Sequence, residues 1–455
     1  MLKIHKYKQC DLNVVIDVNS GAIHIVDDIV YDILDFVDDN QVNEEIIIKG
    51  LGFKYSKEAI NEGIKEIKTL IEEKMLFTDD PYKEMIANDK SKSFIKAMCL
   101  NIAHDCNLRC KYCFADEGDY HGTKQLMSFE VGKKAIDFVI KNSGPRKNIE
   151  VDLFGGEPLM NFEVVKQIME YAKEEGKIHN KNIRFTITTN ATLLNDENME
   201  YINENMGNVV LSIDGRKSVT DKIRVRRDGS GIHDIILPKI KKMVSMRNEG
   251  KQYYVRGTFT RENLDFYEDV MALAEEGFKE ISIEPVVLDD DHPLSLRKED
   301  LGVIFEQYDK LTEEMIKREK QGRGFKFYHF NIDLNGGPCV YKRISGCGAG
   351  HEYVAVTPEG DIYPCHQFVG KEEFKLGTVF QGEIDKELEN QFKNGHIYNK
   401  PKCMDCWARF YCSGGCQANN YNFNKDIHIP YEVGCEMMKK RVECAIVLKA
   451  KLMEE

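Results

Sequence analysis

Ten of the 14 cysteines in this 455-residue chain fall into two groups with regular spacing. The first group has the pattern C-x3-C-x2-C, and the second lies in the last quarter of the chain. The members are Cys106, Cys110 and Cys113, followed by Cys347, Cys365, Cys403, Cys406, Cys412, Cys416 and Cys435. In a reducing compartment, cysteines at such spacings are more often metal ligands than disulfides. We therefore expect two distant stretches of chain to fold around metal.

Composition and charge favour a cytoplasmic protein. The first residues, MLKIHKYKQC, lack the apolar run of a signal peptide, and no apolar stretch is long enough to span a bilayer. The formal net charge of −13 argues against a nucleic-acid partner, because an acidic chain gains nothing from counterion release. Hydrophobic residues make up 42% of the chain, enough for the two or three domains that its length predicts.

Strand-like and helix-like segments alternate through the middle of the chain. The candidate strands are 97–102, 150–154, 183–188, 209–213, 253–259 and 280–284. Helical segments between them indicate βα units and a parallel sheet. Six such units predict an α/β fold with a partial (β/α)6 barrel over residues 93–300.

Three further regions flank the predicted barrel. Residues 1–80 contain two candidate strands followed by helical segments, with Gly63 between the last two segments. We assign residues 301–340 to a charged helical bridge and residues 341–455 to a region rich in Gly and Cys. Such a region is often stabilised by metal, because it buries too little apolar surface alone.

The first cysteine group, in CNLRCKYCF, directly follows the first predicted barrel strand. An all-cysteine zinc site needs four thiolates, and this group supplies three. Three thiolates can instead hold a [4Fe–4S] cube and leave its fourth iron open to a ligand. A structural zinc site and three unrelated buried thiols are the alternatives to this interpretation.

CNLRCKYCF resembles the signature of the radical S-adenosylmethionine (SAM) enzymes, in which an aromatic residue precedes the last cysteine. In that family the open iron binds SAM, and reductive cleavage of SAM gives a 5′-deoxyadenosyl radical. The protein orients the cofactor and shields it from water. The resemblance implies that Cys106, Cys110 and Cys113 are the catalytic cluster ligands and that Tyr112 lies near the adenine.

Three further motifs resemble those of radical SAM enzymes and follow later strands in the family's order. They are Gly155-Gly156-Glu157-Pro158, Thr189-Asn190-Ala191 with alanine where glycine is usual, and Ser212 with Arg224. The resemblance implies that Gly155, Gly156 and Glu157 bind the SAM amino group, Asn190 lies near the ribose, and Ser212 and Arg224 bind the carboxylate. Ligands of βα folds bind at the carboxyl ends of strands, so these motifs support one cofactor site.

The second cysteine group resembles the seven-cysteine pattern of the SPASM domain, with every internal spacing matched. The resemblance implies two auxiliary clusters and hence three [4Fe–4S] clusters in all. It assigns Cys403, Cys406, Cys412 and Cys435 to a distal cluster and Cys347, Cys365 and Cys416 to a proximal one. Cys339 is a candidate eighth ligand. A zinc ribbon built on the four cysteines between 403 and 416 is the alternative. Trp407 is predicted to pack over a cluster and exclude water.

Residues 1–80 resemble the leader-binding domain of enzymes that modify ribosomal peptides. That domain is winged-helix-like and captures a leader peptide as an added strand at its sheet edge. A capping domain that shields the barrel or forms a dimer contact explains the same pattern.

The whole layout resembles sactipeptide synthases and the maturases of six-cysteine (SCIFF) peptides. It implies a radical SAM oxidoreductase that forms a thioether between a Cys sulfur and a carbon of a ribosomally made, cysteine-rich precursor peptide. A flavodoxin- or ferredoxin-like protein would donate electrons. The alternatives are an anaerobic sulfatase maturase, which forms formylglycine, and another SPASM peptide-modifying enzyme. A non-catalytic iron–sulfur or zinc protein is the third hypothesis, and the SAM-contact motifs argue against it.

Overall fold

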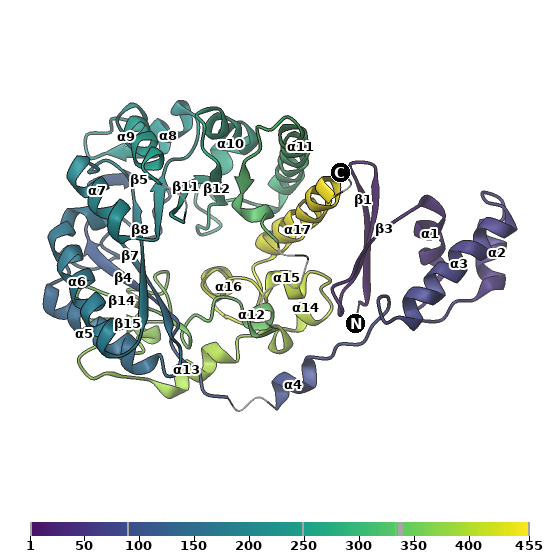
Figure 1. Ribbon diagram of the computed structural model, residues 1–455, viewed down its shortest axis with the longest axis horizontal. Coiled ribbons are helices and arrows are strands. Elements are labelled where there is room, and N and C mark those ends of the chain that lie inside the picture. Colours follow the sequence, from purple (N-terminus) through teal and green to yellow (C-terminus); the bar gives the residue numbers. More distant parts are fainter. Residues whose placement is uncertain (1, 89–90, 248–249, 333, 335–339, 454–455) are drawn as a thin grey trace.

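The computed structural model describes residues 2–88, 91–247, 250–332, 334 and 340–453 (Figure 1). Its largest part is a curved, mainly parallel sheet whose outer face is covered by helices. All six predicted barrel strands are present. They are β4 (Ala97–His104), β7 (Asn148–Gly155), β8 (Asn182–Thr189), β9 (Asn208–Ser212), β11 (Gln252–Phe259) and β12 (Glu280–Pro285). Each lies parallel to the next, so the α/β partial barrel is confirmed.

The helices that follow these strands form the outer layer of the barrel. They are α5 (Phe129–Asn142), α6 (Phe162–Ile178), α7 (Asp196–Asn205), α8 (Lys217–Ile223), α9 (His233–Ser245), α10 (Phe266–Glu275) and α11 (Leu301–Lys320). In α5, the side chain of Ser128 accepts a hydrogen bond from the Val131 N–H and caps the first turn. Val131, Ala135 and Val139 then repeat every four residues and face the sheet, which is why this sequence packs as a helix here.

The parallel sheet extends beyond the six predicted strands at both ends. β13 (Lys326–Phe327) adds to β12, and β14 (Tyr353–Val356) adds in parallel to β4. β14 then leads into an antiparallel run of β15 (Asp361–Tyr363), β16 (Gly377–Thr378) and β17 (Glu383–Ile384). The C-terminal region therefore shares a sheet with the barrel, because the apolar strand β14 pairs with the free edge of β4.

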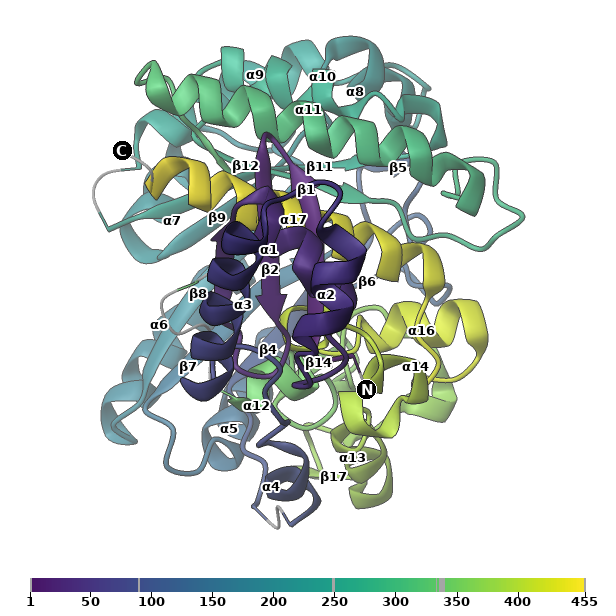
Figure 2. The same ribbon diagram turned by 90° about the vertical axis from the view of Figure 1, so that its right-hand side faces the viewer.

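Helices make up most of the remaining C-terminal region. They are α12 (Val340–Ser345), α13 (Lys386–Lys393), α14 (Pro401–Met404), α15 (Arg409–Cys412), α16 (Gln417–Asn424) and α17 (Glu432–Met453). The longest, α17, packs along α11 of the barrel (Figure 2). Short elements elsewhere are α4 (Lys83–Ala87), β5 (Leu108–Cys110), β6 (Gln125–Leu126) and β10 (Arg224–Arg226). Single 3₁₀ turns lie at 34–36, 158–161, 261–263, 298–300, 328–330, 372–374 and 397–399.

The N-terminal residues form an antiparallel sheet backed by helices. The strands are β1 (Ile4–Gln9), β2 (Leu12–Asp17) and β3 (Ile23–Val26), with β2 in the centre, and the helices are α1 (Asp28–Ile33), α2 (Glu44–Leu51) and α3 (Lys57–Glu72). The sequence did not predict β1 or α2. Gly63 does not interrupt α3. It lies at a close contact with α1, where a Cβ would lie 2.7 Å from the Cδ1 of Ile33.

The N-terminal sheet packs on both faces. Val15 points to the helices of its own unit, whereas Val14 and Ile16 point to the C-terminal region. There they meet Trp407 and the α17 residues Val442, Ile446 and Val447. Figures 1 and 2 both place this sheet against α17.

Among the described residues, no helix has the length and apolar character needed to cross a membrane.

Candidate active site

A cavity of about 230 Å³ opens at the carboxyl ends of the barrel strands. Cys106, Cys110 and Cys113 line it from the loop that follows β4. Its other walls come from the ends of successive strands and include Phe154, Gly155, Gly156, Thr189, Asn190, Ser212, Arg224, Arg256, Thr258 and Glu284. The barrel thus brings together most of the residues that the sequence motifs single out.

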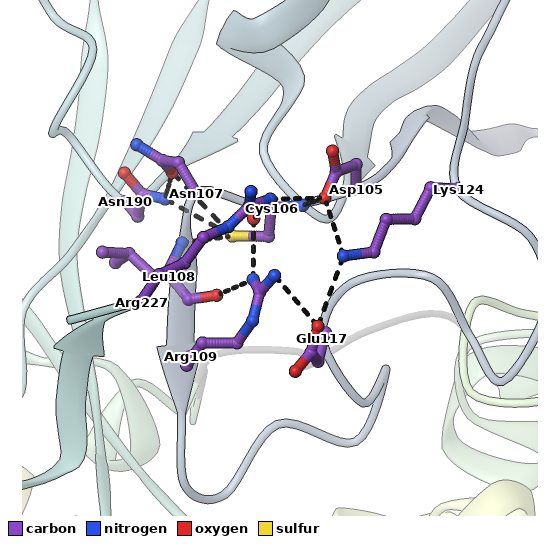
Figure 3. Close-up of polar contacts among 9 residues, drawn as sticks. All are labelled: Asp105, Cys106, Asn107, Leu108, Arg109, Glu117, Lys124, Asn190 and Arg227. Carbon is purple, nitrogen blue, oxygen red and sulfur yellow. Dashed lines mark hydrogen bonds and ion pairs between the residues drawn. The ribbon is translucent and has the colours of Figure 1, made fainter. Parts of the chain in front are cut away.

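Ion pairs and hydrogen bonds hold the cysteine loop in place (Figure 3). The guanidinium of Arg109 donates to the carbonyl oxygens of Cys106, at 2.8 Å, and Leu108, at 2.6 Å. Glu117 pairs with Arg109 at 2.9 Å and with Lys124 at 3.3 Å. Strand pairing adds a second constraint: β10 lies antiparallel to β5, which sets Arg224 directly opposite Cys110. The backbone of the loop is therefore fixed by the protein itself.

The three thiols are in an environment suited to metal ligands. Burial raises the pKa of Cys106 and of Cys110 to about 12 and that of Cys113 to about 11. A thiol in such surroundings stays protonated unless a bound cation stabilises the thiolate. Among the described residues, no three His, Cys, Asp or Glu side chains converge as one metal ion would require. The three cysteines line one cavity.

Gly155 and Gly156 let the end of β7 approach the cysteine loop closely. Gly155 has φ of +118°, and a Cβ on Gly156 would lie 2.1 Å from the carbonyl oxygen of Asp105. Neither position has room for a side chain, so the glycines of this motif serve the fold of the cavity wall as well as any ligand.

Glu157 lies behind this wall, fully buried. Its carboxylate accepts hydrogen bonds from the Leu159 N–H at 3.0 Å, the Thr189 hydroxyl at 2.8 Å and the Asn190 N–H at 2.7 Å. Burial raises the pKa of Glu157 to about 7, although these donors lower it. In the structure the carboxylate holds the turn after β8, and thereby Asn190, in position. The sequence suggested a direct contact with the ligand instead.

Asp214 connects the residues that face the cavity, and the sequence motifs did not single it out. The carboxylate is fully buried and accepts from the Tyr112 hydroxyl at 2.8 Å, from Arg224 Nε at 3.0 Å and from the Thr258 N–H at 3.0 Å. Burial opposes the charge of Arg224, but Asp214 raises the pKa of Arg224 above its usual value. The guanidinium also lies 5.5 Å from the centre of the Tyr112 ring. The position of Asp214 just after Ser212 at a strand end was the available signal.

A second cavity, of about 290 Å³, adjoins the first. Cys412, Cys416 and Cys435 line it. The two cavities share wall residues Arg256, Glu284, Pro285, Val287 and Gln367. The first and second cysteine groups therefore line neighbouring cavities with a common wall.

The shared wall carries a partly buried network of charged residues that sequence reasoning missed. Glu284 lies 3.1 Å from His329 and 3.6 Å from Arg256. Arg441 reaches the network from α17 and lies 3.2 Å from His329. Although burial alone would raise the pKa of Glu284, these cationic neighbours lower it below its ordinary value. The carboxylate of Glu284 and the guanidinium groups of Arg256 and Arg441 thus lie where the two cavities adjoin.

The C-terminal cysteines fall into a group of four and a group of three. Burial raises the pKa of Cys435 to about 12, and its neighbours Cys412, Cys403 and Cys406 raise it further. Burial likewise raises the pKa of Cys365, with Cys416 and Cys347 as its neighbours. Cys339 lies outside the described residues.

Trp407 is buried, but it packs against the N-terminal sheet. Its ring stacks on His5 with the ring centres 3.9 Å apart, and His5 also pairs with Glu443 of α17 at 2.8 Å. Next to it, Arg409 is fully buried and donates to the side chain of Asn19. The N-terminal sheet therefore covers the segment that carries Cys403 and Cys406.

Comparison with known proteins identifies both cysteine regions. Residues 100–243 match the radical SAM superfamily, and residues 347–407 match the SPASM iron–sulfur cluster-binding domain. The protein contains a radical SAM domain and a SPASM domain. The predicted resemblance to radical SAM proteins with a SPASM domain is thereby confirmed. SAM and iron–sulfur clusters are the cofactors of these two domains.

Relatives of this chain include several maturases. A cysteine-type anaerobic sulfatase-maturating enzyme of Clostridium novyi is 25% identical over 336 residues, covering 69% of this chain and 86% of that protein. The radical SAM cyclopropyl synthase TigE of Paramaledivibacter caminithermalis is 23% identical over 406 residues, covering 85% and 79%. The structure of Streptococcus suis SuiB bound to the precursor peptide SuiA aligns with a TM-score of 0.55 at 17% identity, covering 95% and 98%. That structural likeness concerns the fold.

Proposed function

We propose that this enzyme is a peptide maturase that forms an intramolecular thioether, from a Cys sulfur to a carbon, in a ribosomally made precursor peptide. The observation that carries the proposal is the shared wall of the two cavities. A peptide segment lying there would be next to the first cysteine group on one side and next to the C-terminal cysteines on the other. The name of a further relative, the antilisterial bacteriocin subtilosin biosynthesis protein AlbA of Bacillus subtilis, supports peptide modification.

We propose three [4Fe–4S] clusters, held by the two cysteine groups. Cys106, Cys110 and Cys113 would hold the SAM-binding cluster. The group of four would hold a distal auxiliary cluster and the group of three a proximal one. The first cysteine group lines one cavity, and Cys412, Cys416 and Cys435 line the adjoining one, which supports this assignment. When bound at the open iron, SAM would supply a 5′-deoxyadenosyl radical.

The residues around the first cavity would orient the SAM molecule. Asp214 keeps Arg224 charged and fixes the Tyr112 ring, so that the guanidinium can bind a carboxylate and the ring can lie along the adenine. Glu157 holds Asn190 at the wall. Ser212 and the backbone of Gly155 and Gly156 complete the polar lining.

Thioether formation removes two hydrogens from the peptide per bridge. One hydrogen atom would leave the acceptor carbon, and the thiol proton and one surplus electron must also be accepted. Cys412, Cys416 and Cys435 line the second cavity, so the proposed auxiliary clusters would lie close enough to the peptide to accept that electron. A flavodoxin- or ferredoxin-like protein is the proposed external donor for SAM cleavage, in a cytoplasmic setting.

The N-terminal sheet is the proposed binding site for the leader part of the precursor. β3 pairs with β2 along one edge only, so its other edge can accept an added strand. Ile25 on this strand is 46% exposed, and its side chain is available to a bound peptide. Residues 1–80 would thus form the leader-binding domain, ahead of the barrel at 93–300, the helical bridge at 301–340 and the SPASM domain at 341–455.

Anaerobic reconstitution followed by a peptide assay tests this proposal. We expect about twelve irons per chain, as three cubes require, and release of 5′-deoxyadenosine under a strong reductant. With a cysteine-rich precursor, each bridge should lower the mass by two hydrogens and protect one cysteine from alkylation. The variant Cys106→Ala should abolish both the release of 5′-deoxyadenosine and the modification of the peptide. Unchanged peptide masses across cysteine-rich precursors would refute the thioether function.

The sulfatase-maturase alternative is supported by the Clostridium novyi relative. The same assay separates the two functions, because oxidation of cysteine to formylglycine removes the sulfur from the product whereas a thioether keeps it. The variant Ile25→Glu adds a second distinction. It should weaken binding of a leader-bearing precursor and leave the modification of a leaderless peptide unchanged.

A further inference from the structure

Lys400 is a fully buried lysine among the C-terminal cysteines. Its Nζ donates a hydrogen bond to the carbonyl oxygen of Gly414 at 2.8 Å. A neutral carbonyl does not balance a charge, and an ammonium group costs several kcal/mol to bury without an anionic partner. Burial lowers the pKa of Lys400, and the thiols of Cys403, Cys412, Cys416 and Cys435 act in the opposite direction.

The position of Lys400 relates it to both groups of cysteines. Cys403, Cys412 and Cys435 belong to the group of four, whereas Cys416 belongs to the group of three. A nearby cation, Lys439, differs because it is partly exposed and paired with Glu436 at 2.8 Å. Lys400 is therefore the buried cation that both groups share.

The loop between Cys412 and Cys416 is shaped around the ammonium group. Ser413, Gly414 and Gly415 all have positive φ, which turns the Gly414 carbonyl toward Lys400. A Cβ on Gly414 would lie 3.1 Å from the lysine Nζ and 3.2 Å from its Cδ. The glycine thus serves both the left-handed backbone and the close approach of the lysine.

Four neutral thiols cannot compensate a buried ammonium group, but thiolates bound to iron–sulfur cubes can. A [4Fe–4S] cube with four thiolates has a net negative charge, and reduction adds one more. A cation in the low-dielectric interior stabilises the reduced form more than the oxidised form. Net charge and hydrogen bonding near the sulfurs are among the factors that set the potentials of such clusters.

We propose that Lys400 is the internal counter-charge of the two auxiliary clusters and raises their reduction potentials, making them better electron acceptors. This inference rests on the two auxiliary clusters of the proposed function, but not on the identity of the peptide. It makes Lys400 a positioning residue that acts through the clusters and does not contact the substrate.

Redox titration of the reconstituted holoenzyme, followed by electron paramagnetic resonance and without peptide, tests this role. Lys400→Met removes the charge and the hydrogen bond, while Lys400→Gln removes the charge and can still donate to the Gly414 carbonyl. The control is Lys402→Met, which removes an exposed charge only two positions further along. Iron and sulfide are counted in every sample. The SAM-binding cluster, held in the barrel, serves as an internal reference.

We expect both Lys400 variants to shift the auxiliary midpoints to more negative potential. Lys402→Met and the SAM-binding cluster should remain at their wild-type values. If Lys400→Met binds less iron than wild type, the auxiliary midpoints of Lys400→Gln are compared with those of wild type instead. Unchanged auxiliary midpoints in Lys400→Gln would overturn the proposal, since a shift in Lys400→Met alone reflects packing. Wild-type protein with iron for one cluster only would overturn it too. If the auxiliary midpoints shift as expected but the peptide assay fails, only the thioether function is refuted.

Discussion

Buried carboxylates at strand ends organise the wall of the first cavity. Asp214 and Glu157 are both fully buried, and each binds three donors, but their partners differ. Asp214 pairs with the guanidinium of Arg224, whereas Glu157 accepts from two backbone N–H groups and a hydroxyl. Burial raises the pKa of the second carboxylate, Glu157, to about 7, although its three donors lower it.

The charge of Asp214 can be tested by Asp214→Asn. This change preserves size but leaves Arg224 buried without its anionic partner, which typically costs about 3–5 kcal/mol. We expect a lower melting temperature and weaker SAM binding, measured by equilibrium dialysis with reconstituted enzyme. The control Tyr112→Phe removes only one hydroxyl donor and should have a smaller effect on both. Equal SAM affinity in wild type and Asp214→Asn would contradict this role.

Glu157 makes stability depend on pH. Its folded pKa of about 7 exceeds its ordinary value of 4.5, so the native state holds the proton more tightly than the unfolded state. Its stabilising contribution is complete below about pH 4.5 and is lost as pH rises through about 7, on the order of 3 kcal/mol in total. Melting temperatures of wild type should therefore fall relative to Glu157→Gln as pH rises from about 4.5 to about 7. Parallel curves for the two proteins would exclude this effect.

At the scale of elements, α17 joins three parts of the molecule. It packs on α11 of the barrel, carries Cys435 beside the other cysteines of its group, and supports β2 of the N-terminal sheet. Arg441 on this helix also donates to the hydroxyl of Tyr308 in α11 at 2.8 Å. One helix thus holds the barrel, the cysteine region and the N-terminal sheet together.

Ile446 tests the contact between α17 and β2. The side chain is fully buried in the cluster that includes Val14 and Ile16 of β2. Ile446→Ala should destabilise the fold by about 2–5 kcal/mol through the cavity it leaves, and Ile446→Val by about 0.5–1.5 kcal/mol. Thermal unfolding followed by circular dichroism measures both. If alanine and valine behave alike, the contact is not packed as the structure has it.

At the scale of the whole molecule, the N-terminal sheet covers the C-terminal cysteine region. Deletion of residues 1–80 would expose Trp407 and the apolar face of α17. We expect the truncated protein to retain less iron and to aggregate in size-exclusion chromatography, because a large apolar patch becomes exposed. Trp407 is the only tryptophan, so a red shift of the emission of the iron-free protein reports the loss of this contact.

Two outcomes separate this integral role from a detachable one. Ile25→Glu, on the free edge of β3, should leave the tryptophan emission and the iron content unchanged. A truncated protein with native emission and full iron content would show that residues 1–80 are an independent appendage.

Local patterns in the sequence determined the barrel strands and the two cysteine groups. Strand and helix periodicity is a property of a few neighbouring residues, which is why all six strands from β4 to β12 could be predicted. Cluster ligands follow short fixed spacings, which can likewise be recognised in the sequence. Strand β1, which is half-buried along most of its length and has no strong alternation of apolar residues, and the short helix α2 gave weaker signals and were missed.

Tertiary structure alone decided which distant residues meet. The pairing of β14 with β4, the contact of β2 with α17, and the wall of Arg256 and Glu284 between two cavities all join segments far apart in the chain. Such contacts depend on shape and burial in the assembled fold, so no local spacing encodes them. Lys400 shows the same limit: its sequence context is that of an ordinary surface lysine, and only burial among cysteines gives its charge a consequence.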